Sequence, residues 1–291
     1  METNIQKTTY VCNFNNTNYN PRFLAHGMDA EFKKKHNIDT DQKMSRTYID
    51  AFGSSQDMLK AIISISKRAR AVHKSFVVCS VGSSTQYADD LIPVTLMANH
   101  SKAMEELRQE YFGRVTDFLD NYVQLKDNAI AEFNGAVDGF YYPSLEEVQN
   151  KFSWSFKKNA LPDANAFDQK LGNLELEQEM RDDVSSKYKE LISIAVLNVV
   201  DRLKIDIQKI KSQASGDKAV NEATLNNFAS FLTMLPDLNI SGCPKIAKAY
   251  EDAKQLLKHS PSATADQSIK DVLIEKTTSI LNDLDAINYN K

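Results

Sequence analysis

Cysteine, glycine and proline are scarce in this chain of 291 residues, which holds three, nine and seven of them. The thiols of Cys12, Cys79 and Cys243 are odd in number and far apart, so they give neither a disulfide framework nor a paired-thiolate metal motif. We therefore expect a protein of the reducing cytoplasm. Average chains hold about 7% glycine and 5% proline, so their scarcity here permits long uninterrupted helices.

Long apolar runs and an excess of one charge are also missing. The longest apolar run, residues 192–200, contains Ser193 and Asn198 and is far shorter than the roughly 20 residues of a membrane span. The polar start of the chain does not resemble a signal peptide. The 35 basic and 39 acidic residues leave a net charge of -4. We expect a soluble protein without a membrane partner, and the charge disfavours general nucleic-acid binding.

Common catalytic and metal-binding motifs are absent from the sequence. There is no glycine-rich phosphate loop, paired-histidine metalloprotease motif, calcium loop or nucleophile elbow. Adjacent carboxylates, such as Asp89 with Asp90 and Asp182 with Asp183, are expected on solvated helix faces. The histidines share no ligand spacing and are expected at the surface or at its boundary. They are His26, His36, His73, His100 and His259. We expect no metal, no cofactor and no enzymatic activity; an enzyme with an unfamiliar site is the third alternative.

The N-terminal part of the chain shows no sustained hydrophobic period. Residues 1–53 are polar with isolated aromatics, which predicts an irregular arm that packs against something. Residues 8–14 (TTYVCNF) and 75–81 (SFVVCSV) have strand-like composition and could form a minor β pair. Propensity alone does not separate such short apolar runs from helix.

Helical periodicity dominates the rest of the chain, and residues 54–287 are predicted to form one mostly α domain. A first helix is expected over residues 54–72. Longer helices are expected from residue 101 to about 133 and from 174 to 214, each with one apolar stripe. Since such stripes are not stable in water, we expect the two long helices to pack as an antiparallel, coiled-coil-like hairpin over residues 101–214.

Proline and glycine divide the last section, residues 219–287, into three amphipathic helices. Their expected ranges are 221–235, 244–258 and 265–287.

An aromatic segment is expected as a cap inserted in the hairpin, over residues 139–171. Pro143 and Ser144 precede Glu147 as a capping box for a short helix. The aromatic side chains form either a small core that seats the cap or a protein-binding surface, because such residues dominate interface energetics. The candidate protein-binding residues are Tyr141, Tyr142, Phe152, Trp154 and Phe156.

The strongest basic patch comprises Lys67, Arg68, Arg70 and Lys74, and Lys33, Lys34 and Lys35 form a second one. Either patch could bind phosphate or an acidic partner. The alternative is a solvated helix end, where positive charge complements the helix dipole.

A family resemblance rests on four parts of the chain: the first long helix, the segment YYPSLEEVQNKFSWSF, the second long helix and the segment ATLNNFASFLTMLPDLNISGCPKIAKAYEDAKQLL. In this order they resemble a phage and bacterial family of helical proteins of unknown function. Genes of that family lie beside a MoxR-type AAA+ ATPase and a von Willebrand factor A-like protein. The resemblance covers residues 54–287 and implies a phage or mobile-element setting with an ATPase partner. The family offers no established catalytic residues to transfer.

These observations favour a non-enzymatic helical interaction or assembly protein of the bacterial cytoplasm, which associates with itself or with a partner such as an AAA+ ATPase. The alternative function is nucleic-acid association through the patch at Lys67, Arg68, Arg70 and Lys74.

Overall fold

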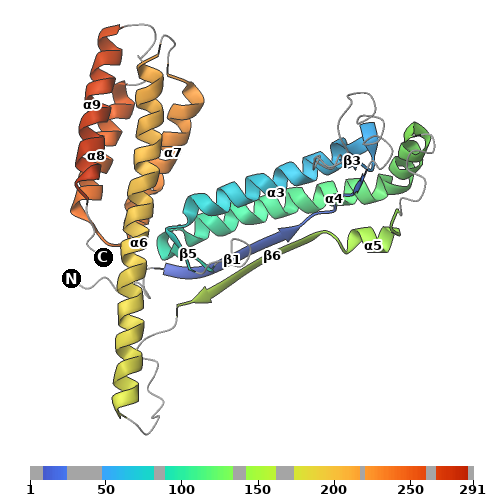
Figure 1. Cartoon of the computed structure of the whole chain (residues 1–291), viewed down its shortest axis with the longest axis horizontal. Coiled ribbons are helices and arrows are strands. Elements are labelled where there is room, and N and C mark those ends of the chain that lie inside the picture. The colour runs from blue at the N-terminus through green and yellow to red at the C-terminus, as the bar shows by residue number, and fades with distance from the viewer. Residues whose placement is uncertain are drawn as a thin grey trace, which may run out of the picture. The chain divides into compact units, whose positions relative to one another are not determined.

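The structure is mostly helical, as predicted, and includes a small antiparallel sheet (Figure 1). The computed structural model describes residues 9–24, 48–81, 89–133, 142–161, 174–216, 220–259 and 267–287. Its helices are η1 (Gly53–Gln56), α3 (Asp57–Phe76), η2 (Val94–Leu96), α4 (Met97–Phe133), α5 (Leu145–Gln149), α6 (Leu174–Ala214), α7 (Glu222–Leu238), α8 (Pro244–His259) and α9 (Gln267–Asp285). Its strands are β1 (Thr9–Thr17), β2 (Arg22–Leu24), β3 (Tyr48–Asp50), β4 (Cys79–Val81), β5 (Asp89–Pro93) and β6 (Ser153–Ala160).

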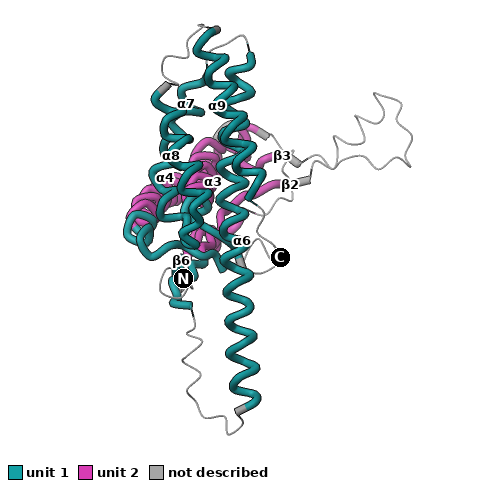
Figure 2. The backbone as a smooth tube through the Cα atoms, turned by 90° about the vertical axis from the view of Figure 1, so that its left-hand side faces the viewer, with its two compact units in different colours: residues 1–13, 73–101, 156–291 teal, residues 14–72, 102–155 magenta. Residues whose placement is uncertain are grey.

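Two compact units divide the chain (Figure 2). Unit 1 comprises residues 1–13, 73–101 and 156–291, and unit 2 comprises residues 14–72 and 102–155. Their borders fall inside β1, α3, α4 and β6.

Unit 1 contains a bundle in which α6 packs against α7 and α9, and α8 packs against the same two helices. The stripe from Leu191 to Ile210 on α6 is buried together with Phe228 and Leu235 of α7 and Leu273 of α9. These helices begin and end close to the expected positions, and α6 spans the predicted range. The apolar periodicity therefore predicted this part of the fold well.

The C-terminal end of α6 is satisfied by a buried lysine. Lys270 of α9 is only 4% exposed, and its ammonium donates to the carbonyl of Gly216, just after α6 ends, over 2.7 Å. Terminal helix carbonyls lack partners in their own helix, so this contact fixes α9 against the end of α6.

Polar side chains of α6 also hold the segment that leads into β4. Arg202 donates to the carbonyls of Ser75 and Val77 over 2.8 and 3.1 Å, and Asn198 donates to the carbonyl of Val78 over 3.2 Å. The guanidinium of Arg202 also lies 4.8 Å from the ring centre of Phe231. Its burial lowers its pKa, with the charge of Asp206 acting in the opposite direction.

Unit 2 has a core of aromatic rings. Phe118 lies between Phe52 and Phe152, at ring-centre distances of 5.8 and 5.9 Å in edge-to-face geometry. Tyrosine hydroxyls at the core donate to backbone carbonyls: Tyr111 to Thr17 over 2.7 Å, and Tyr122 to Pro143 over 2.7 Å. The rings thus contribute apolar burial while their polar ends stay paired.

The predicted coiled-coil hairpin is wrong. The apolar stripe of α4, from Met104 to Ala129, is buried in the core of unit 2, whereas that of α6 is buried in the core of unit 1. Each stripe is covered by other elements. Periodicity showed which faces are buried but did not identify their partners.

The prediction of an irregular N-terminal arm is also corrected, because residues 9–24 and 48–50 contain the strands β1, β2 and β3. The two strand-like segments do contain strands, β1 and β4, but they do not pair with each other. The sheet order is β4-β5-β1-β6, so β5 lies between them. β5 was not predicted.

The expected aromatic cap is only partly present. The capping box is confirmed, because Ser144 and Glu147 exchange hydrogen bonds at the start of α5. The residues that follow form β6, which pairs with β1 as an integral strand of the sheet.

Replacing Lys270 with alanine should lower the free energy of unfolding by about 1–3 kcal/mol, because the carbonyl of Gly216 loses its buried donor. Urea unfolding followed by circular dichroism measures this loss. Lys258→Ala, at an exposed position of α8, is the matched control and should change stability little. Equal effects of the two substitutions would contradict the capping role.

Candidate functional site

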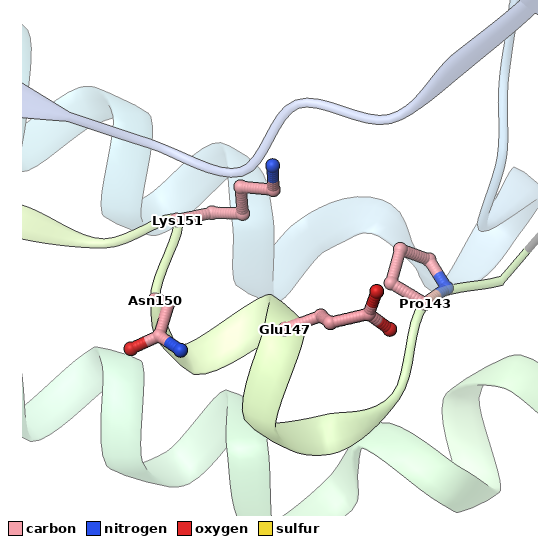
Figure 3. Close-up of a pocket in the computed structure, with 4 residues that line it drawn as sticks. All are labelled: Pro143, Glu147, Asn150 and Lys151. Atoms are coloured by element: carbon pink, nitrogen blue, oxygen red, sulfur yellow. The ribbon is translucent and has the colours of Figure 1, made fainter.

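A shallow pocket of about 380 Å³ lies beside α5 in unit 2, lined by Pro143, Glu147, Asn150 and Lys151 (Figure 3). The carboxylate of Glu147 accepts from the backbone N–H of Ser144 over 2.7 Å. Ligand sites usually bring several polar groups together in an apolar cavity. This lining is instead the cap of a short helix, and we assign it no function.

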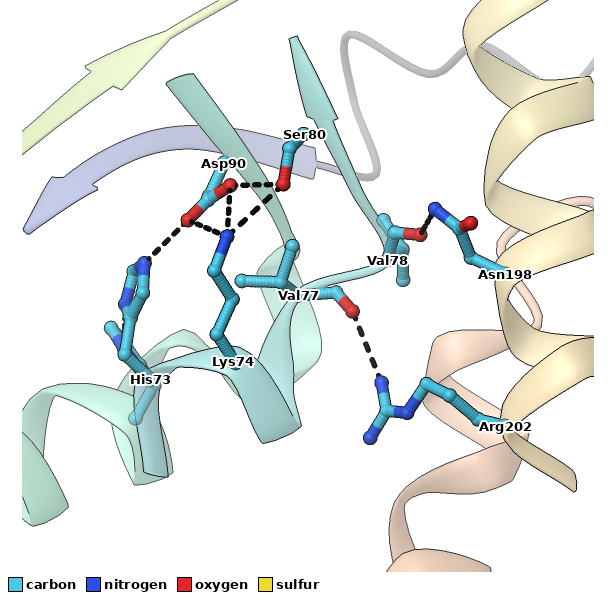
Figure 4. Close-up of polar contacts among 9 residues, drawn as sticks. His73, Lys74, Val77, Val78, Ser80, Asp90, Asn198 and Arg202 are labelled. Atoms are coloured by element: carbon cyan, nitrogen blue, oxygen red, sulfur yellow. Dashed lines mark hydrogen bonds and ion pairs between the residues drawn. The ribbon is translucent and has the colours of Figure 1, made fainter. Parts of the chain in front are cut away.

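A buried polar cluster in unit 1 is the stronger candidate (Figure 4). Its centre is Asp90 on β5. The strand register places Asp90 opposite Cys12 of β1 and Ser80 of β4, so these three side chains share one face of the sheet. The last turn of α3 brings His73 and Lys74 to this face, and the first turn of α4 brings His100.

Three donors satisfy the carboxylate of Asp90. His73 Nε2 lies 2.9 Å from Oδ2, Ser80 Oγ donates to Oδ1 over 2.5 Å, and Lys74 Nζ lies 3.0 Å from both oxygens. Burial raises the pKa of Asp90, but the hydrogen bonds from His73, Ser80 and Lys74 together outweigh it and hold the pKa below its usual value. Asp90 is therefore an ionised carboxylate in the interior.

The second nitrogen of His73 extends this network to His100. Nδ1 of His73 lies 3.0 Å from Nε2 of His100. Since ionised Asp90 accepts from Nε2 of His73, a neutral His73 must accept at Nδ1 from the N–H of His100. That tautomer leaves Nδ1 of His100 with a lone pair that has no partner among the described residues.

Apolar surroundings keep His100 neutral. The side chain is fully buried, and its ring centre lies 5.1 Å from that of Phe76 and 5.0 Å from that of Phe156. Burial, with smaller contributions from the charges of His73 and Lys158, lowers the pKa of His100 to about 3. The cluster thus runs from an exposed ammonium on Lys74 to a neutral imidazole in the core.

An Asp–His–His chain can in principle orient a proton, as in hydrolases with a carboxylate–imidazole pair, but such catalysis needs a nucleophile and room for a substrate. The nearby thiols are poor nucleophiles, because burial raises the pKa of Cys12 to about 11 and that of Cys79 to about 12. Within the described ranges, no group of three or more His, Cys, Asp or Glu side chains could hold a metal ion. The geometry supports a structural role, in which the cluster joins α3, α4, β4 and β5 inside unit 1.

The predicted aromatic residues lie mostly in the cores. Phe152 is 7% exposed in the core of unit 2, which agrees with the small-core alternative for this residue. Tyr142 and Trp154 pack half-buried against the same core, and Phe156 packs half-buried in unit 1. Tyr141 lies outside the described residues. The small-core alternative is therefore favoured for the described aromatics.

Most of the predicted basic patch is engaged within the protein. Arg68 forms an ion pair with Glu110, Arg70 donates to the side chain and carbonyl of Asn16 over 2.9 and 3.3 Å, and Lys74 binds Asp90. Lys67 is exposed. The patch at Lys33, Lys34 and Lys35 lies outside the described residues. These engagements reduce the charge available for phosphate.

Sequence interpretation missed the buried cluster. His73 and His100 were expected at the surface, and Asp90 on a solvated helix face, yet all three are buried. The sequence did contain a signal for the burial of the two histidines. His73 lies four residues after Ala69, and His100 lies four residues before Met104, so each histidine falls on the apolar face of its helix. The apolar run after Asp90, which ends at Pro93, is typical of a short buried strand.

Fold and cluster together define a mostly helical protein with a four-stranded antiparallel sheet and a buried ion network. Comparison with protein-family models, curated proteins and solved structures found no match to this chain. No described helix combines the length and apolar character needed to cross a bilayer.

Asp90→Asn should lower the free energy of unfolding by about 3 kcal/mol, because the amide leaves the buried imidazole of His73 and the hydroxyl of Ser80 without an ionised acceptor. Asp89→Asn is the matched control, since Asp89 is the exposed neighbour on the same strand. Urea unfolding of both variants measures the difference. A loss no greater in Asp90→Asn than in the control would exclude the proposed ion network.

Stability should fall with acid because of His100. Its pKa is about 3 in the folded protein against an ordinary 6.5, so below pH 6.5 the unfolded chain takes up a proton that the folded protein excludes. The stabilisation is complete above pH 6.5 and is lost toward pH 3, with a slope of about 1.4 kcal/mol per pH unit. Asp90 contributes a further loss of stability only below about pH 3.8, its ordinary pKa. Its pKa in the folded protein is lowered, so the unfolded chain takes up the proton first.

Urea unfolding at several pH values between about 7.5 and 4.5 tests this linkage. His100→Gln removes the titrating ring and should flatten the dependence. A dependence as steep in the variant as in the parent protein would assign the acid sensitivity to other groups.

Proposed function

We propose that this chain is a non-enzymatic helical interaction or assembly protein, and that the N-terminal half of α6 is a docking surface for another protein. One observation carries the proposal. The α6 helix continues for several turns beyond the bundle of α7, α8 and α9, as both views show (Figures 1 and 2). None of residues 175–190 is buried, and the first buried residue of the helix is Leu191.

Apolar side chains recur at every fourth position of this segment. They are Leu176, which is 44% exposed, and Met180, Val184 and Tyr188, which are half-buried. Residues four apart lie on one helix face, so they form a continuous apolar row. Complete burial of such a side chain contributes about 1.5–3 kcal/mol, so a partner that covered the row would gain substantial binding energy.

None of residues 175–190 is buried, although Tyr188 packs against the edge of the core, and the segment is helical because it continues a helix that is already formed. Its C-terminal half is fixed by the core of unit 1, which removes the unfavourable nucleation step. Glu175 and Glu177 in the first turn complement the helix dipole. Gln178 donates to Asp182, one turn further, over 3.0 Å.

The charge on this segment indicates what kind of partner fits. Acidic side chains flank the apolar row at Glu175, Glu177, Glu179, Asp182 and Asp183. A partner with an apolar groove and a basic rim would be complementary. The family resemblance adds a specific candidate, namely a MoxR-type AAA+ ATPase from a phage or mobile element in a bacterial cytoplasm.

Two observations favour this proposal over the other functions considered. In the buried cluster, His73, Ser80 and Asp90 are hydrogen-bonded to other members of the cluster. This arrangement gives little support to an enzymatic function. Intramolecular partners engage Arg68, Arg70 and Lys74, which gives little support to nucleic-acid binding.

Introducing charge into the apolar row should abolish association. The double substitution Met180→Glu and Val184→Glu should weaken self-association or ATPase binding at least about tenfold, as expected for central interface residues. Ser185→Glu with Ser186→Glu, on exposed positions of the same helix, is the matched control. Light scattering after size exclusion, and binding to the purified ATPase, measure both kinds of association.

A photo-crosslinking amino acid at position 184 gives a second readout in cells. It should form adducts with a partner chain, whereas the same group at position 186 should form few. A strictly monomeric protein that yields no adduct from position 184 would contradict the proposed docking surface.

A further inference from the structure

Among the residues that the structure describes, β6 is an edge strand of the four-stranded sheet. The strand order places β1 on one side of β6 and no described strand on the other. Beyond the sheet ladder itself, no backbone hydrogen bond among the described residues reaches positions 156–160. The opposite edge, β4, has only three residues, whereas β6 has eight. An edge of this length presents backbone N–H and C=O groups that can pair with another strand.

Residues 156–160 of this edge belong to unit 1 and carry two adjacent lysines. Successive side chains of a strand point to opposite faces, so Lys157 and Lys158 place positive charge on both faces of the sheet. Lys158 is held by a 2.7 Å bond to Ser101 Oγ and lies 5.1 Å from the ring centre of Phe156. Lys157 is exposed and has no hydrogen bond or ion pair with the described residues.

These charges discriminate between two occupants of the edge. A second copy of β6 would bring lysines close to lysines, and like charges across strands are destabilising. Lysine on an edge strand is a common means of preventing such self-pairing. An acidic strand would instead pair with Lys157 on one face and Lys158 on the other.

We propose that residues 156–160 of β6 bind an extended, acidic segment of another protein, which adds to the sheet as a fifth strand. Backbone hydrogen bonds along the edge supply the affinity, and carboxylates opposite Lys157 and Lys158 supply the selectivity. This surface is independent of the apolar row on α6, so either proposal can fail without the other.

The probe is a fluorescent peptide of about ten residues with pairs of adjacent glutamates between valines, so that an added strand presents carboxylates on both faces of the sheet. Anisotropy measures its affinity for the full chain, and hydrogen exchange locates its position. Binding should protect amides within residues 156–160 and should weaken as salt is raised. A peptide with every amide N-methylated, which has no backbone donor on either edge, should lose binding.

Lys157→Glu should lower the affinity for the peptide at least about fivefold, because an attractive cross-strand charge pair becomes a repulsive one. Lys258→Glu, which makes the same charge change at an exposed position of α8, is the matched control. The α6 variant with glutamate at positions 180 and 184 should bind the peptide like the parent protein.

Absence of binding, or binding that is insensitive to N-methylation, would overturn the proposal. So would protection outside residues 156–160, or equal affinity of the Lys157→Glu variant and its control. Protection of the same amides in concentrated protein without peptide would show that a second copy occupies the edge, which also contradicts an acidic partner.

Discussion

An ionised carboxylate inside a helical protein needs several donors, and the geometry around Asp90 follows from that requirement. Taking a single charge out of water costs several kcal/mol unless it is paired and hydrogen-bonded. His73, Lys74 and Ser80 provide the donors, so the end of α3 and the strand β4 must both approach β5. His73 in turn fixes His100 at the start of α4. Four elements of unit 1 are therefore positioned by one charge.

Helical periodicity made much of the fold predictable from the sequence. The bounds of α6 and the order of α7, α8 and α9 follow from apolar spacing and from punctuation by proline and glycine. The partners of the two long stripes were not predictable, because spacing shows that a face is buried but not what covers it. The strand β5 was missed because a short apolar run such as that of residues 91–93 is compatible with a buried strand but does not distinguish it from helix.

The candidate site was less predictable than the fold, and the reason is physical. A histidine or an aspartate in a sequence has a strong prior for the surface, since an unpaired charge is rarely buried. The burial of Asp90 depends on donors that come from α3 and β4, and only tertiary structure brings these together. The aromatics near Phe152 illustrate the opposite error, in which a conspicuous local composition serves the core.

The packing of unit 1 bears on both proposed docking surfaces, because each surface includes an element that this unit holds in place. The exposed half of α6 continues from a core-packed helix, and residues 156–160 of β6 belong to the sheet that carries Asp90. Preorganised surfaces lose less conformational entropy on binding than flexible ones. In the proposed function, the buried ion network acts on binding indirectly, through the order that it imposes on unit 1.

The protonation states of the cluster test this account most directly. Long-range nitrogen–proton NMR spectra of the histidine rings, recorded across neutral and mildly acidic pH, identify which ring nitrogens carry protons. The account predicts a His100 that stays neutral beside an ionised Asp90. A His100 that titrates near its ordinary pKa, or a carboxyl carbon signal showing Asp90 protonated at neutral pH, would contradict it.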